Sequence, residues 1–172
     1  MKEKERIIKK IESDKSRPVL FSESFGGSEN QLRFLLKYVA DEHFKNINLI
    51  LNNTNPDLIE KDQINILWVQ HFVNQKEVAN LRSKEFVDKL DYIVFNSNWN
   101  FEKFQYQFKI PEHKSIVIKN AIEKIEYKER SKDQINLIYH STPWRGLELL
   151  LNIFEKFNLK NVELNVCSST SI

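Results

Sequence analysis

All three glycines of this chain lie where a predicted strand turns into a predicted helix. Gly26 and Gly27 precede a helix that begins near Ser28, and Gly146 opens a later helix. Glycine at such a turn permits unusual backbone dihedrals and lets a phosphate approach the N–H groups of the helix N-terminus. Arg145 is the one cation beside these turns, and its guanidinium can hold a diphosphate at two points. These residues indicate phosphate binding, although a steric need for glycine explains a single turn equally well.

Several common ligand motifs are missing from the sequence. Neither glycine turn matches the dinucleotide-binding Gly-x-Gly-x-x-Gly fingerprint or a Walker A loop. No Asp-x-Asp pair occurs, and no group of His, Asp and Glu has the spacing of metal ligands. The single cysteine, Cys167, excludes a Cys-rich zinc site and an internal disulfide, and we expect it to be buried at a strand end. The sequence therefore predicts neither a metal nor another cofactor.

His71 is the candidate catalytic residue because it follows Trp68-Val69-Gln70 out of a predicted strand. An imidazole there could hydrogen-bond a reacting hydroxyl, although a lone histidine is more often structural. Small or polar residues also follow the other predicted strands, where open parallel sheets bind their ligands. They are Ser22-Glu23-Ser24, Asn52-Asn53, Asn96-Ser97-Asn98, Asn120, His140-Ser141-Thr142 and Cys167-Ser168. The tryptophans lie near strand ends too, where an indole can stack on a sugar although core packing is its more common role: Trp68, Trp99 and Trp144.

Seven short apolar runs predict the strands that position these residues. They are Val19 to Phe25, Ile47 to Leu51, Ile64 to Val69, Tyr92 to Phe95, Ile116 to Ile118, Ile135 to Tyr139 and Val162 to Val166. Between the runs, apolar residues at helical spacing predict amphipathic helices over Leu32 to Val39, residues 75–90, Phe101 to Phe108 and Leu147 to Phe154. Alternating strands and helices predict an α/β fold with a Rossmann-like parallel sheet and flanking helices.

The pattern of charge and apolar residues divides the chain into four segments. Residues 1–16 predict a peripheral helix with isoleucines on one side, and a membrane-surface anchor is the alternative. Residues 17–122 predict a Rossmann-like domain, and the polar residues 123–133 predict a linker. Residues 134–172 hold one strand-helix-strand unit, which is too small for a self-sufficient core. We therefore expect this second domain to be incomplete.

The overall composition excludes several classes of protein. The chain has 172 residues, of which 41% are hydrophobic and 29% charged, as in a globular domain. Its net charge is +2 and is spread along the sequence, which disfavours nucleic-acid binding. No apolar run reaches the roughly 20 residues of a membrane-spanning helix, and the charged N-terminus is unlike a secretory signal. We expect a cytoplasmic protein that can lie peripherally at a membrane.

Five segments together resemble glycosyltransferases of the GT-B fold, family 4, also called glycosyl transferases group 1. Phe25-Gly26-Gly27-Ser28-Glu29 is similar to the glycine-rich first loop of that family, and Trp68 to Phe72 to its histidine-bearing strand end. Phe95-Asn96-Ser97-Asn98-Trp99 resembles its "V-S-x-W" segment, and Ile116 to Ile122 resembles its "V-I-x-N-G/A-I" segment. His140 to Leu147 resembles its donor-diphosphate loop. The resemblance spans residues 18–168.

The resemblance implies two Rossmann-like domains that face a cleft, with a nucleotide-sugar as donor substrate and a glycan, lipid or protein as acceptor. It implies metal-independent transfer with retention at the anomeric carbon. The donor phosphate would lie at Gly26, Gly27, Arg145 and Gly146, and His71 would contact the reacting sugar. The candidate contacts to the sugar or acceptor are Glu29, Asn98, Trp99, Asn120 and Ser141. Fixed N–H groups and a guanidinium can stabilise a leaving diphosphate without a metal.

The chain also departs from the family, whose later C-terminal region, including a paired-glutamate motif, has no counterpart in this sequence. We therefore expect a glycosyltransferase truncated within its C-terminal domain, or its acceptor-side half, with a partner chain or self-association completing the second domain. A non-catalytic binding module that retains the fold is the main alternative. A small phosphate-binding α/β enzyme unrelated to sugar transfer is a third hypothesis.

Overall fold

The structure is a computed structural model that describes residues 2–13, 27–129, 133–157 and 160–167. The chain divides into two compact units, Met1–Glu123 and Lys124–Ile172, so the division falls at the start of the predicted linker. The predicted strand Val19 to Phe25 and the candidate site residue Gly26 lie outside the described residues.

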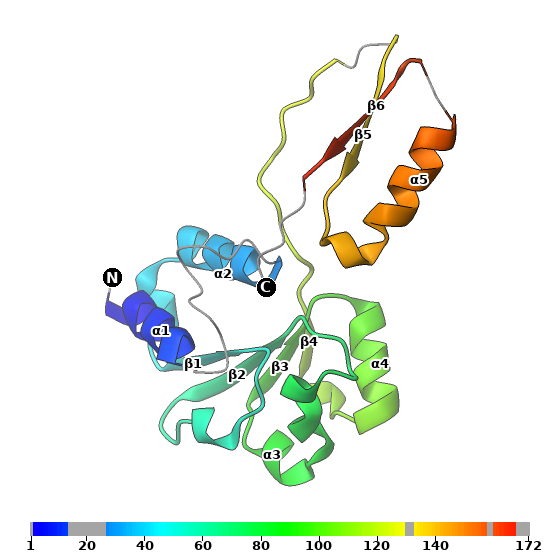
Figure 1. The fold of residues 1–172 in the computed structure, drawn as a ribbon. Coiled ribbons are helices and arrows are strands. Elements are labelled where there is room, and N and C mark those ends of the chain that lie inside the picture. The colour runs from blue at the N-terminus through cyan, green and yellow to red at the C-terminus, as the bar shows by residue number, and fades with distance from the viewer. Residues whose placement is uncertain (1, 14–26, 130–132, 158–159, 168–172) are drawn as a thin grey trace. The chain divides into compact units, whose positions relative to one another are not determined.

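The described residues of unit 1 form a parallel sheet of four strands in the order β1-β2-β3-β4 (Figure 1). The strands are β1 (Ile47–Leu51), β2 (Ile64–Val69), β3 (Tyr92–Phe95) and β4 (Ser115–Val117). Three of them have the bounds that the apolar runs predict, and β4 is shifted by one residue. The predicted α/β fold with a Rossmann-like parallel sheet is therefore confirmed.

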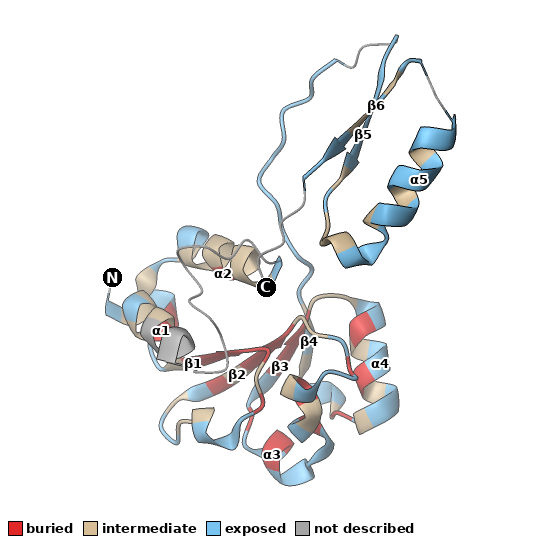
Figure 2. Ribbon diagram, in the orientation of Figure 1, coloured by how far each residue is buried: buried red, intermediate tan, exposed pale blue. Residues whose placement is uncertain are grey.

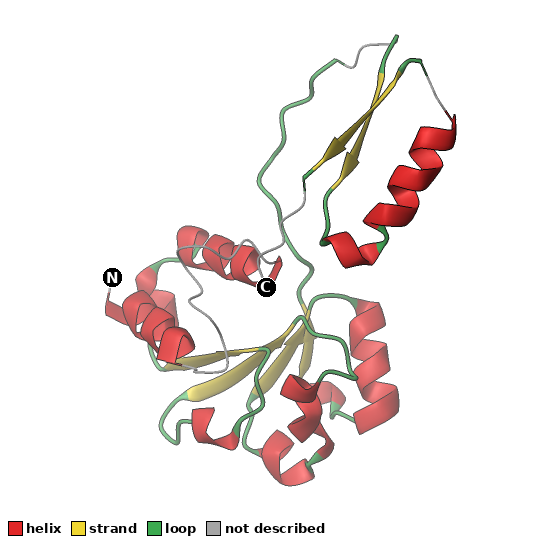
Figure 3. Ribbon diagram, viewed as in Figure 1, coloured by secondary structure: helices red, strands yellow, loops and turns green. Residues whose placement is uncertain are grey.

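Helices cover both faces of this sheet (Figure 3). On one face lie α1 (Lys2–Ser13), α2 (Gly27–Tyr38) and the short 3-10 helix η1 (Asp41–Phe44); on the other lie η3 (Lys76–Arg82), α3 (Lys84–Asp88) and α4 (Asn98–Phe108). The single-turn helices η2 (Pro56–Leu58) and η4 (Glu112–Lys114) lie in connections. Successive strand residues alternate between the two cores: Trp68 and Val94 pack toward α1 and α2, whereas Val69 and Phe95 pack toward α3 and α4. Both faces are thus buried, which explains the nearly continuous hydrophobicity of the strands.

The helix predicted over residues 75–90 is wrong as a single helix, because the structure has η3 and α3 there with a break at Ser83. Ser83 has an extended backbone and its hydroxyl accepts from the Phe86 N–H, so it ends η3 and caps α3. Within η3, the Thr54 hydroxyl donates to the carbonyl of Glu77 (2.8 Å) and accepts from the N–H of Asn80 (3.2 Å). Glu77 also accepts from the Thr54 N–H (2.9 Å). The inward residues of this segment are nonetheless buried as predicted: Val78, Leu81, Phe86, Val87 and Leu90.

The phenylalanine stripe of α4 faces the core as predicted. Phe104 is fully buried, and Phe101 and Phe108 pack against the same cluster. The helix begins after Ser97, whose hydroxyl accepts from the Asn100 N–H (3.1 Å), and ends at Lys109, which has a left-handed backbone with φ of 55°. Ser97 therefore fixes where α4 starts relative to the end of β3.

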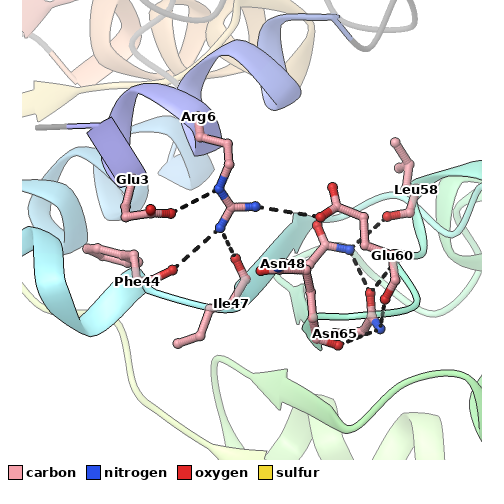
Figure 4. Close-up of polar contacts among 9 residues, drawn as sticks. Glu3, Arg6, Phe44, Ile47, Asn48, Leu58, Glu60 and Asn65 are labelled. Carbon is pink, nitrogen blue, oxygen red and sulfur yellow. Dashed lines mark hydrogen bonds and ion pairs between the residues drawn. The ribbon is translucent and has the colours of Figure 1, made fainter.

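Arg6 anchors α1 to the amino edge of the sheet (Figure 4). Its guanidinium donates to the carbonyl oxygens of Ile47 (2.7 Å) and Phe44 (3.4 Å), and it pairs with Glu3 (3.0 Å) and Glu60 (3.6 Å). The next residue, Ile7, is buried in the core with Leu32 and Phe44. The amino-terminal helix therefore packs on the sheet of unit 1.

Asn48 and Asn65 form a buried polar pair beside this anchor (Figure 4). The two residues are paired in register on β1 and β2, and the Asn48 amide donates to Asn65 Oδ1 (2.6 Å) and to the Leu58 carbonyl (2.8 Å). Asn65 in turn binds the backbone of Glu60 through both ends of its amide (3.0 and 2.9 Å). These bonds satisfy the buried amides and fix the connection between β1 and β2.

Unit 2 is a single strand-helix-strand unit, as the sequence predicts. Parallel strands β5 (Ile135–Tyr139) and β6 (Val162–Val166) are joined through the 3-10 helix η5 (Pro143–Arg145) and α5 (Leu147–Phe157). Among its described residues none is buried (Figure 2). The expectation that Cys167 is buried is wrong: this residue is exposed, because the described residues of the unit form no buried core over the end of β6.

The helices of the described part of the chain include none with the length and apolar character needed to cross a membrane.

Candidate functional site

The candidate site of unit 1 lies at the carboxyl edge of its sheet. All four strands are parallel, so the residues that follow Leu51, Val69 and Phe95 come together at one edge. These residues are Asn52, Gln70, His71, Asn96, Ser97 and Asn98. The structure therefore brings His71 and Asn98 to the same edge, as the sequence predicts.

Asn52 ties three segments of this edge together. Its side chain is fully buried, and its backbone has a left-handed φ of 51°, which asparagine tolerates better than most residues. Its Oδ1 accepts from the N–H groups of Gln70 (2.5 Å) and His71 (3.1 Å), and its Nδ2 donates to the Ser28 hydroxyl (3.0 Å). Asn52 thus joins the ends of β1 and β2 to the first turn of α2. The sequence placed Asn52 at a strand end but gave no sign of this role.

The main chain of His71 is held from two sides. Its N–H donates to Asn52, and its carbonyl oxygen accepts from the Asn100 Nδ2 at 3.5 Å. Asn100 is itself buried in the first turn of α4, whose position Ser97 fixes. The residue is half-buried, in the loop directly after β2. Its main chain is therefore anchored both to Asn52 and to α4.

The backbone requires a glycine at only one of the two described glycine positions. Gly146 has φ of +96°, a conformation that strains any other residue, so its backbone explains the glycine. Gly27 has no positive φ, and a Cβ built there would meet no atom of the described residues within 4 Å. The steric explanation therefore holds for Gly146, whereas the described part of the chain gives no steric reason for Gly27, the exposed first residue of α2.

The segment after β4 is bound to α2. The Gln31 amide donates to the carbonyl of Ala121 (2.8 Å) and accepts from its N–H (2.9 Å). Farther along the helix, Lys37 and Tyr38 both hydrogen-bond to the Glu123 carboxylate. The hydrogen bond to Lys37 is the main reason that the pKa of Glu123 lies below its ordinary value, and the pKa of Lys37 is raised by the same contact. These contacts place the exposed Asn120 beside the helix that carries Gly27 and Glu29.

Two aromatic residues form an exposed pair at this edge. The rings of Phe72 and Trp99 stack with centroids 5.7 Å apart and planes 19° apart, and Lys103 Nζ lies 5.5 Å from the Trp99 ring centre. Trp99 is a predicted contact residue, whereas Phe72 and Lys103 are not. Of the three tryptophans only Trp68 is buried; the expected core packing is wrong for Trp99 and Trp144, which are 55% and 68% exposed.

The candidate site residues of unit 2 lie between β5 and α5. Ser141 follows β5, and Arg145 and Gly146 connect η5 to α5. The turn is fixed by the Tyr139 hydroxyl, which donates to the Thr142 carbonyl (2.7 Å), and by the Arg145 N–H, which donates to the same oxygen (3.0 Å). The Arg145 side chain is exposed, and within the described residues of the chain it has no ion-pair partner. Its charge is therefore available to an anion.

The described residues contain no group of three or more His, Cys, Asp or Glu side chains that could hold a metal ion.

Comparison with models of known protein families gives no match, and comparison with curated protein sequences gives none either.

Proposed function

We propose that this chain is the acceptor-side half of a glycosyltransferase that uses a nucleotide-sugar donor. One observation carries the proposal. Asn52 binds Ser28, the residue after Gly27, and also the backbone of His71. A single buried side chain thus links the candidate donor-phosphate residue to the candidate catalytic residue at the carboxyl edge of the sheet, where α/β folds bind ligands. The described residues give no steric reason for Gly27, which favours a role in letting a ligand approach the backbone.

The chemistry follows from these positions. Cleavage of a glycosyl-phosphate bond develops negative charge on the leaving oxygen, which preorganised N–H groups and cations stabilise. In unit 1 the N–H groups at the start of α2 would supply such donors. Taken by itself, the turn of unit 2 offers the exposed Arg145 guanidinium to a phosphate. His71 would hydrogen-bond the reacting sugar from an anchored backbone. The transfer would retain the anomeric configuration and need no metal.

A second candidate is a non-catalytic interaction module with the same fold. The apolar side chains of unit 2 favour it, because many remain exposed over the described residues of that unit: Ile135, Leu137, Ile138, Leu149, Leu151, Ile153 and Phe157. Such surfaces mark interaction sites. A partner chain or a second copy that completes this unit would bury them.

Isothermal titration of the whole chain with UDP, GDP and ADP tests the first candidate. We expect one of them to bind, and Arg145→Ala to weaken it by about 10- to 100-fold because a charge-assisted hydrogen bond is lost. Lys156→Ala, which removes an exposed cation in the last turn of α5, is the matched control and should leave binding unchanged. EDTA should have no effect. Absence of binding in a folded protein, or binding that Arg145→Ala leaves intact, would favour the interaction module.

A further inference from the structure

The exposed pair of Phe72 and Trp99 is not explained by the core of unit 1. Neither residue belongs to the two apolar clusters that cover the sheet, and the two side chains are 42% and 55% exposed. The side of α4 that packs on the core consists of Phe101, Phe104 and Phe108. Exposing two large, nearly parallel rings to water is unfavourable. A ligand that covers them would therefore gain binding free energy from burying their apolar surface.

The surroundings of this pair are polar. Asn98 is exposed directly before Trp99, and the half-buried His71 lies directly before Phe72. The Phe72 N–H donates to Gln75 Oε1 (3.1 Å), which holds the loop after β2 in place. An exposed aromatic face with an amide beside it suits a pyranose, whose C–H face packs on a ring while its hydroxyls hydrogen-bond to nearby polar groups.

Lys103 adds a charge to this surface. Its Nζ lies 5.5 Å from the centre of the Trp99 ring, and it makes no ion pair with any residue of the described chain. Helical spacing places it one turn after Trp99 on the same side of α4. A carboxylate on a sugar packed against Trp99 would meet this ammonium.

We propose that Phe72, Trp99 and Lys103 form a binding surface for an anionic pyranose, such as a uronic acid unit of an acceptor glycan. The identification of that glycan as an acceptor rests on the proposed transferase function; the binding surface itself does not. The surface lies at the carboxyl edge of the sheet, next to His71, where an acceptor hydroxyl would have to be presented.

The test is titration of the whole chain with tetragalacturonate and maltotetraose, a charged and a neutral oligomer with the same type of linkage, followed by NMR or tryptophan fluorescence. We expect tetragalacturonate to bind with a Kd of about 1 mM or lower and maltotetraose several-fold more weakly. Trp99→Ala and Phe72→Ala should each weaken binding by about three- to tenfold. Lys103→Gln should remove the preference for the charged oligomer and its salt dependence. Tyr106→Ala, at a 91% exposed position of the same helix, is the matched control.

The outcomes separate this surface from the transferase proposal. Binding that the three variants weaken and Tyr106→Ala does not would support the surface, whether or not a nucleoside diphosphate binds. No saccharide binding in a chain that still binds a nucleoside diphosphate would overturn the surface and leave the transferase proposal standing. Saccharide binding unaffected by Trp99→Ala and Phe72→Ala would also overturn it. Circular dichroism of each variant establishes that the fold is intact.

Discussion

The N–H of His71 donates to Oδ1 of Asn52 over 3.1 Å, so the candidate catalytic residue is positioned by a buried side chain from the neighbouring strand. The same oxygen accepts from Gln70, and the other end of the amide donates to Ser28. All these polar groups are satisfied within unit 1, which explains how an asparagine can be fully buried beside an apolar core. The edge of the sheet is therefore preorganised before any ligand binds.

Replacing Asn52 by Ala should destabilise unit 1 by about 1–3 kcal/mol, because two backbone N–H groups lose their acceptor and a left-handed backbone loses a tolerant residue. Urea unfolding followed through the fluorescence of the buried Trp68 measures this change. Asn74→Ala, at an exposed position of the next loop, should change stability by less than about 0.5 kcal/mol. Equal stability of the two variants would show that Asn52 is not the anchor of this edge.

Gly27→Ala and Gly146→Ala should have opposite effects. Gly27 has no left-handed φ, and no atom of the described residues lies within 4 Å of a Cβ built there. Alanine should therefore leave the stability unchanged or raise it by a few tenths of a kcal/mol, while it weakens binding of a nucleoside diphosphate. Gly146 has φ of +96°, so alanine there should lower the free energy of unfolding by about 1–2 kcal/mol. Thermal unfolding and titration of each variant measure the two effects. If Gly27→Ala binds the nucleotide as well as the original chain, the phosphate role of this glycine is refuted.

The strands were the most predictable part of the fold, and the contacts between distant segments were the least. Both faces of the sheet are buried, so the sequences of β1, β2 and β3 are nearly continuous apolar runs. The first and last residues of each run therefore predict where the strand begins and ends. The hydrogen bonds of Thr54 with Glu77 and Asn80 were not predictable, because they join segments more than 20 residues apart in the sequence. The same holds for the site: His71 and Trp99 could be found by their place after a strand, whereas their partners Asn52 and Phe72 depend on tertiary contacts.

The contact of Glu123 with Lys37 predicts a bell-shaped contribution to the stability of unit 1. The pKa of Glu123 is held below 4.5, mainly by the Lys37 hydrogen bond, so its contribution is present above pH 4.5 and is lost as the pH falls through the lowered pKa. The pKa of Lys37 is raised above 10.5, mainly by the Glu123 hydrogen bond, so its contribution is present below pH 10.5 and is lost as the pH rises through the raised pKa. Comparison of the original chain with Glu123→Gln across pH measures the difference. Both side chains are exposed, so the effect should be small and should shrink in high salt.

Lys114 offers a test of whether stability and binding can be separated in this unit. Its ammonium donates to three carbonyl oxygens at and after the end of α3, those of Val87 (3.1 Å), Asp88 (3.1 Å) and Leu90 (2.7 Å). A cation at a helix C-terminus is favourable, and Lys114→Met would leave these carbonyls without it, at a cost of about 1–2 kcal/mol in the free energy of unfolding.

Lys84→Met is the control variant: it removes a lysine from the exposed first position of α3 and should change the free energy of unfolding little. Because Lys114 precedes β4, it lies at the amino edge of the sheet, opposite the edge that carries Asn52 and His71. Urea unfolding should therefore show a loss in Lys114→Met, while titration under folding conditions shows nucleotide and saccharide affinities equal to those of the original chain. A loss of affinity in the folded variant would mean that binding depends on the amino edge, and the assignment of the site to the carboxyl edge would be wrong.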